Sequence, residues 1–270
     1  MLRLVSSYAT SAALNIIIPC ARTGGAAHFS SSASCLFTKQ DPVALSEAIR
    51  RIMRTSAQPV ALVSAFLPSD LGTGPSNQIH TTTLSSFTTV SLAPPLVAFS
   101  IRLPSRMADA LRAGAAIPTS HHQSPTPAQI MSKKPHFLIH ILSSTQGPLS
   151  DYFAKPGAPP YVVGQANQDG HPFDTHPMQL SESVEGQLIP RDAVGTLACS
   201  LVYQLDLTSS DLHGTTEFEN GCIHTDEVGS MLFLAHIHHV EQGDVPPSVS
   251  DVRKPLVYWH QKYHTCNEAL

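Results

Sequence analysis

The sequence HTTTLSSFTTVSLAPPLVAFSIRLPS, residues 80–105, contains the features that decide the fold. Eight of the twelve residues from 80 to 91 carry a hydroxyl group, and a double proline then precedes an apolar run. Threonine is a good strand former and serine is common in loops, so the hydroxyls alone have an ordinary structural explanation. The pattern predicts two strands, residues 80–92 and 95–101, joined at the double proline as an antiparallel pair.

The hydroxyl groups of the first predicted strand follow an alternating pattern. Thr81, Thr83 and Ser85 are in phase and would share one strand face, whereas Ser86 and Thr88 would lie on the other. Hydroxyls together with backbone N–H groups can hold the polar rim, the sugar alcohols or the phosphate of a cofactor. We therefore expect a polar ligand along this strand.

A candidate anion site follows directly in the sequence. Ser100, Arg102, Ser105 and Arg106 stand beside the start of a predicted helix, residues 105–114, for which Ser105 is a suitable N-cap. A helix N-terminus with a neighbouring arginine binds anions readily. The two features together favour a phosphate-bearing ligand with a polar tail.

The composition of the chain excludes several classes of function. Only 13% of the 270 residues are charged and the formal net charge is −4, so no cationic field exists for nucleic acid. Pro, Ser or His interrupts every apolar run before the roughly 18–20 residues that cross a bilayer, so we expect no membrane span and a soluble mature protein. An odd count of five cysteines without a C-x-x-C pair disfavours a disulfide framework and a cysteine zinc site.

The first forty residues differ from the rest of the chain. Residues 1–40 contain no Asp or Glu but hold Arg3, Arg22 and Lys39 among many Ser and Ala. This composition is typical of a mitochondrial transit peptide and predicts a mitochondrial matrix protein, the alternatives being a disordered N-terminus and a cytoplasmic location. The predicted folded domain covers residues 41–270.

The remaining sequence predicts a β-rich domain. An amphipathic helix is expected near residues 41–58 and a second short one near 148–157, with further strands at residues 60–66, 136–143, 193–207 and 230–242. Six or more strands with few helices favour a small antiparallel barrel. Residues 157–190, which show little periodicity, are expected to form a long surface excursion, and residues 208–229 form a second polar insertion.

Six segments of this sequence resemble the flavin reductase-like family, the FMN-binding split barrels. They occur in the family's order and approximate spacing across residues 45–265: PVALVSAF, HTTTLSSFTTVSLAPPLVAFSIRLPSRMADALR, HFLIHILSSTQGPLSDYFAKPG, AVGTLACSLVYQL, MLFLAHIHHV and PLVYWHQKYHT. The most specific part is T-x-S-S-F-x-x-V-S-L-x-P-P-L-V-x-F-S-I at residues 83–101. The chain resembles the fungal mitochondrial members of the family.

The resemblance implies a mainly β fold, an antiparallel six-stranded split β-barrel with a few flanking helices. It further implies a homodimer that binds FMN, or less often FAD, at the subunit junction and reduces it by hydride transfer from NADH or NADPH. Some members release the reduced flavin to a partner oxygenase. The positions that match the family's cofactor-binding residues are Thr83, Leu84, Ser85, Ser86, Val90, Ser91, Ser100, Arg102, Ser105 and Arg106.

Two positions depart from the family pattern. Many members have H-G-x-T where this chain has residues 80–83, HTTT, so a side chain replaces a glycine. Many also carry G-D-H before the penultimate strand, where this chain has Val228, Gly229 and Ser230, so the histidine is missing. His224 could fold back to replace it. The enzyme either tolerates this loss, because the flavin does the chemistry, or is a non-catalytic flavin-binding or protein-interaction barrel.

Other polar residues receive no assigned role. His236 and His238 would share a strand face and could offer two imidazoles to a metal, but further ligands are not evident, so no metal site is predicted. Cys199 lies in an apolar strand and is expected to be a small core residue. Because the cofactors carry hydride transfer themselves, no catalytic residue is predicted.

Overall fold

The structure is a computed structural model that describes residues 42–68, 77–115, 133–165, 170–207, 229–242 and 253–266. The chain divides into two compact units, Met1–Pro42 and Val43–Leu270, and the elements below belong to the second, apart from the first residue of the first helix. The predicted leader, His224 and all but the last residue of the predicted insertion 208–229 lie outside the described residues.

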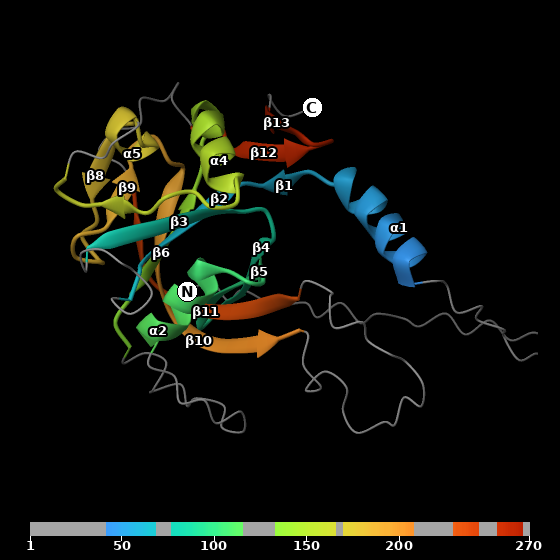
Figure 1. Cartoon of the computed structure of the whole chain (residues 1–270), viewed down its shortest axis with the longest axis horizontal. Helices are drawn as coiled ribbons and strands as arrows, with labels where there is room; N and C mark the ends of the chain where they lie inside the picture. The colour runs from blue at the N-terminus through green and yellow to red at the C-terminus, as the bar shows by residue number, and fades with distance from the viewer. Residues whose placement is uncertain are drawn as a thin grey trace, which may run out of the picture. The chain divides into compact units, whose positions relative to one another are not determined.

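One antiparallel sheet forms the centre of the domain (Figure 1). Its strand order is β4-β5-β11-β10-β6-β2-β3-β7, and every neighbouring pair is antiparallel. The mainly β, antiparallel fold is therefore confirmed, but eight hydrogen-bonded strands are described, so the expected count of six is not. The strands are β2 (Ala61–Phe66), β3 (Gln78–Leu84), β4 (Phe87–Leu92), β5 (Pro95–Arg102), β6 (Phe137–Ile141), β7 (Tyr161–Val162), β10 (Gly195–Asp206) and β11 (Ser230–Glu241).

One face of this sheet encloses the largest apolar core. The phenyl rings of Phe99 and Phe233 stack at 5.4 Å between centroids, and Phe137 packs edge-on against Phe99 at 6.1 Å. Helix α2 (Arg106–Ala115), as predicted, contributes buried Met107 and Leu111 to the same cluster. Apolar residues at alternate positions of β2, β5 and β11 supply the rest, because successive side chains of a strand point to opposite faces.

The sequence from residue 80 to 92 forms two strands instead of the single predicted strand. β3 ends at Leu84 and β4 begins at Phe87, so Ser85 and Ser86 form a corner between them. Serine suits such corners as well as strands, which is why the alternating pattern did not reveal the break. The expected sharing of one face by Thr83 and Ser85 does not apply across this corner.

The described parts of residues 157–190 are packed into the domain, so the predicted surface excursion is wrong. His171, Phe173 and Ile189 are buried, and the His171 ring lies 5.3 Å from the Phe173 ring. The carboxylate of Glu241 accepts a 2.8 Å hydrogen bond from the hydroxyl of Ser181, which attaches the segment to β11. The elements here are short: β7, α5 (Pro172–Thr175), β8 (Met178–Leu180) and β9 (Leu188–Pro190).

A buried polar network crosses the sheet from β2 to β10. His140 Nε2 lies 2.9 Å from the hydroxyl oxygen of Ser64, which itself donates to the side-chain oxygen of Gln187 at 3.0 Å. Ser64 must therefore accept the Nε2 proton, so His140 Nδ1 is left to accept from the hydroxyl of Thr196 at 3.0 Å. All four side chains are fully buried, and burial lowers the pKa of His140 to about 3. The network thus needs a neutral imidazole.

We expect the fold to lose stability as the pH falls below about 6.5, the pKa of an unfolded histidine. Burial lowers the pKa of His80 and of His136 to about 4 and that of His140 to about 3. Between these values the unfolded chain binds protons that the folded chain does not. Each histidine then removes up to about 1.4 kcal/mol of unfolding free energy per pH unit.

Urea unfolding at several pH values between 7.5 and 5, above the ordinary carboxyl range, measures this loss. The matched control is His239→Gln, which replaces an exposed histidine and should leave the pH dependence unchanged. Equal unfolding free energies across this interval would contradict the assignment of these histidines as neutral and buried.

The N-terminal helix adjoins a small second sheet. Helix α1 (Pro42–Arg54) confirms the predicted amphipathic helix, and β1 (Gln58–Pro59) pairs with β12 (Leu256–Trp259), which pairs with β13 (Lys262–Thr265). The indole of Trp259 donates to the carbonyl of Thr55 at 2.9 Å, which holds the end of the helix. The apolar side chains of α1 remain exposed: Val43, Leu45, Ile49, Ile52 and Met53.

Helix α4 (Gly147–Ala154) follows the 3₁₀ turn η1 (Ser144–Gln146) and packs on β3. The short helix expected after residue 148 is thereby confirmed. No helix within the described ranges combines the length and the apolar character that a membrane crossing requires.

Candidate functional site

Three of the predicted site residues form a row on one face of the sheet at β5. The hydroxyl of Ser86 lies 3.0 Å from the hydroxyl of Ser100 and also reaches the Ser100 carbonyl at 3.3 Å. Arg102 follows two residues later on β5, so its side chain leaves the same face and is exposed. We call Ser86, Ser100 and Arg102 the β5 row.

The β5 row leads to the start of α2. The hydroxyl of Ser105 accepts the backbone N–H of Ala108 at 3.4 Å, so Ser105 is the predicted N-cap. Arg106 is exposed and donates one bond, at 3.0 Å, to the carbonyl of Ala158. Burial, together with the positive charge of Arg106, which acts in the same direction, lowers the pKa of His80 to about 4. The His80 imidazole near Arg106 is therefore neutral at pH 7.

The other predicted site residues lie elsewhere. Thr83 donates its hydroxyl proton to the carbonyl of Ser150 on α4 at 2.8 Å, and Leu84 is buried in the core. Val90 and Ser91 lie at the far end of the β4–β5 pair, beside a register shift. Ser91 accepts the backbone N–H of Ala93 at 3.2 Å, which stabilises the turn between the strands. These four residues are not gathered with the β5 row.

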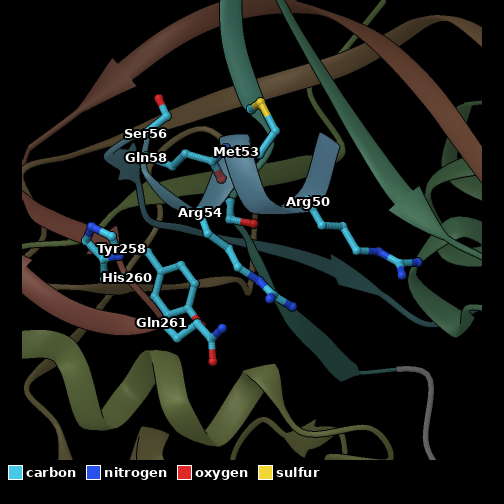
Figure 2. A pocket seen from close by; sticks show the side chains of 9 residues that line it. Arg50, Met53, Arg54, Ser56, Gln58, Tyr258, His260 and Gln261 are labelled. Carbon is cyan, nitrogen blue, oxygen red and sulfur yellow. The ribbon is translucent and has the colours of Figure 1, made fainter. Parts of the chain in front are cut away.

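Ser85 lines a pocket for which the sequence carries no signal. Figure 2 labels the other residues that line it. The pocket has a volume of about 200 Å³. It lies where the end of α1, the β3–β4 corner and the β12–β13 turn meet. Its lining residues are Arg50, Met53, Arg54, Ser56, Gln58, Ser85, Tyr258, His260 and Gln261. Because they come from three distant parts of the chain, no sequence motif marks them.

The donors at the β5 row and the α2 start suit the phosphate and sugar of a flavin mononucleotide. Among the described residues, neither Arg102 nor Arg106 has a carboxylate within ion-pair distance, and Arg106 commits one donor to the carbonyl of Ala158. A guanidinium presents five donors, so most remain free for an anion. The 200 Å³ pocket alone is smaller than the ~300–1,000 Å³ of ordinary cofactor sites, so a flavin would need the open row as well.

Ser230 is the residue that the resemblance places where many family members carry a histidine. It is the first residue of β11 and stands opposite Arg102 of β5 in the antiparallel register. A hydroxyl therefore lies next to the β5 row where an imidazole is expected. A serine hydroxyl can orient a ligand by hydrogen bonding, but it does not titrate near neutral pH.

His236 and His238 of β11 lie side by side, but they do not form part of a larger group of metal-ligating side chains among the described residues. His236 Nδ1 lies 3.4 Å from His238 Nε2, which is 2.7 Å from the hydroxyl of Ser200. No cluster of three or more metal-ligating side chains occurs among the residues that the structure describes. Cys199 is fully buried, and burial raises the pKa of its thiol, so it serves as a core residue.

These features define a class of protein: an antiparallel β domain with a hydroxyl row that ends at a cationic helix start. Residues 53–267 match the family model described as the flavin reductase like domain. Because this match spans most of the 270 residues, the chain belongs to the flavin reductase-like family.

Solved structures of flavin reductases share this fold. The styrene monooxygenase flavin reductase SMOB from Pseudomonas putida S12 matches with a TM-score of 0.52 and 18% identity, over 83% of this chain and 99% of that one. The NADH:FAD oxidoreductase SgcE6 from Streptomyces globisporus C-1027 matches with a TM-score of 0.52 and 19% sequence identity, and the match covers 85% of this chain and 97% of that one. BorF, the flavin reductase component of a bacterial two-component tryptophan halogenase, matches with a TM-score of 0.51 and 18% sequence identity, and the match covers 83% of this chain and 99% of that one.

Proposed function

We propose that this chain binds FMN, with FAD as the alternative flavin, and reduces it with NADH or NADPH. The observation that carries the proposal is the β5 row, in which paired serine hydroxyls lead to Arg102 at the end of β5, four residues before the start of α2. This order matches a ligand with a polar chain that ends in a phosphate. Family membership supports the same assignment.

Each residue of the site would have a limited role. Ser85 and Ser86 orient the ring edge and sugar alcohols, while Arg102 and Arg106 hold the phosphate by charge-assisted bonds. A bound flavin would supply the acceptor for one hydride, that is, two electrons and one proton, from the reduced nicotinamide. The protein contributes by aligning the two cofactors and excluding water, so no acid or base of the chain is required for the transfer.

We also propose that the working unit is a homodimer. The apolar residues of α1 are exposed, with Val43 at 74% and Ile52 at 68%. A helix with one apolar side normally buries that side against another element. We propose that a second copy of the chain covers the apolar side of α1.

A non-catalytic flavin-binding or protein-interaction role is the second candidate function. It is favoured by Ser230, which stands beside Arg102 at the position where the family pattern carries a histidine. If the missing imidazole is essential for turnover, the chain would bind flavin without oxidising a nicotinamide.

The location and the electron acceptor follow as further proposals. The composition of residues 1–40 supports import into the mitochondrial matrix. Two of the similar structures are the reductase of a styrene monooxygenase and the reductase component of a two-component halogenase. By analogy we propose that this chain delivers reduced flavin to a partner oxygenase.

A visible absorption experiment tests the proposed activity. The purified chain is mixed with FMN, separated from free flavin, and then given NADH or NADPH under anaerobic conditions. Bound flavin absorbance that disappears on addition of reductant is the expected result. Flavin that binds but is not reduced, even with free FMN as acceptor, would favour the non-catalytic role; failure to take up flavin would reject both.

A further inference from the structure

Two arginines and no carboxylate occur among the described residues that line the pocket beside Ser85. Arg50 and Arg54 are four residues apart on α1, so they share one helix face, and both line the pocket. The lining includes no Asp or Glu. Arg50 reaches Glu47 at 3.6 Å, but both side chains are largely exposed, so this pair is weak. Figure 2 shows Arg54 and Tyr258 among the side chains that line the pocket.

The turn that closes this pocket has an unusual backbone. His260 and Gln261 have φ values of 48° and 62°, and both side chains line the pocket. Positive φ at both central positions of a two-residue hairpin turn strongly favours Asn and Gly. Non-glycine residues kept in such a conformation point to a functional use of their side chains.

The pocket and the proposed flavin site meet at one corner. Ser85 lines the pocket, whereas its neighbour Ser86 belongs to the β5 row. A volume of about 200 Å³ lies below the ~300–1,000 Å³ of ordinary ligand sites, so only one part of a dinucleotide could enter it. The ring of Tyr258 offers a face on which a planar base can stack.

We propose that this pocket binds the adenosine end of NADPH, with Arg50 and Arg54 on its 2′-phosphate, so that the enzyme prefers NADPH to NADH. The inference rests on the proposed flavin reductase activity and deepens it. In dinucleotide sites an Asp or Glu accepts the ribose 2′-hydroxyl, whereas an Arg accommodates the 2′-phosphate. This pocket has two guanidiniums and no carboxylate, which suits the phosphate.

Isothermal titration calorimetry with 2′,5′-ADP and 5′-ADP tests the pocket without any flavin. The two ligands share adenosine and two phosphates and differ in where one phosphate is attached. We expect 2′,5′-ADP to bind about tenfold or more tightly than 5′-ADP, and Arg54→Ala to abolish this difference. The matched control is Arg51→Ala, an exposed arginine of the same helix that does not line the pocket.

Several results would overturn the proposal: equal affinities, no binding of either ligand, or an equal loss in Arg51→Ala and Arg54→Ala. With FMN-loaded enzyme, Arg54→Ala should lower kcat/KM for NADPH about tenfold or more and leave that for NADH unchanged. An FMN titration separates the two proposals. If Arg54→Ala instead weakens FMN, the pocket holds the flavin phosphate and the inference fails, whereas flavin binding itself stands.

Discussion

Replacing Arg102 with alanine is expected to weaken FMN binding about 10- to 100-fold and to leave riboflavin binding unchanged. Arg102 ends the β5 row and has no ion-pair partner among the described residues, so its donors are free for a phosphate. A hydrogen bond to a charged group is worth about 1.5–3 kcal/mol, and each 1.4 kcal/mol is a factor of about ten in affinity. Riboflavin lacks the phosphate, so its affinity measures the contacts of the ring and the sugar chain alone.

Fluorescence titration of both flavins against the wild type and the variant measures this effect. Arg112→Ala serves as the matched control, since Arg112 is an exposed arginine in the last turn of α2, away from the start. An equal loss of FMN and riboflavin would indicate that Arg102 supports the fold instead of the phosphate, and an unchanged FMN affinity would remove it from the site.

Replacing Phe233 with alanine is expected to lower the free energy of unfolding by about 3–5 kcal/mol. Phe233 is fully buried, stacks on Phe99 at 5.4 Å, and lies in the core beneath the β5 row. Its removal leaves a cavity that the stacked ring cannot fill without moving. Since single domains are stable by only about 5–15 kcal/mol, this change consumes a large share of the total.

Urea unfolding of the Phe233→Ala chain measures the loss. Val240→Ala on the same strand is the matched control, because Val240 is 55% exposed and should change stability by less than about 0.5 kcal/mol. If the alanine variant fails to fold, Phe233→Leu, which keeps most of the volume, provides the measurement. A loss no larger than that of Val240→Ala would contradict the placement of Phe233 in the core.

The strands of the core could be predicted because they are short apolar segments bounded by turn residues. β2 and β5 combine β-branched and aromatic residues with proline boundaries, and both were expected within a residue or two of their ends. Ser105 was also predictable as the cap of α2, since capping needs only local geometry. Strand composition and helix capping depend on neighbouring residues only, so they can be predicted without the tertiary structure.

The corner at Ser85 and Ser86 could not be predicted from the local sequence pattern. The pattern of hydroxyls there is compatible with one long strand and with two strands, and tertiary packing decides between them. α4 packs against β3, and Thr83 donates to its Ser150 carbonyl, a contact between residues 67 apart in sequence. The sequence therefore predicted that Thr83 and Ser85 share a face, and the structure separates them.

The segment 157–190 was misread for a related reason. Its elements are too short to show a period, and glycine, proline and histidine are typical of loops. His171 and Phe173, at the start of α5, nevertheless enter an aromatic cluster with Tyr161 of β7 and Phe153 of α4. Likewise Arg54 and Tyr258 line one pocket although 204 residues separate them. Neither grouping is visible without the fold.

A crystal structure of the FMN complex tests the central claim most directly. We expect the flavin ring beside the corner at Ser85 and Ser86, the sugar chain along Ser100, and the phosphate within about 3 Å of the guanidinium of Arg102. Flavin bound at another surface, with Ser100 and Arg102 in contact only with solvent, would contradict the account.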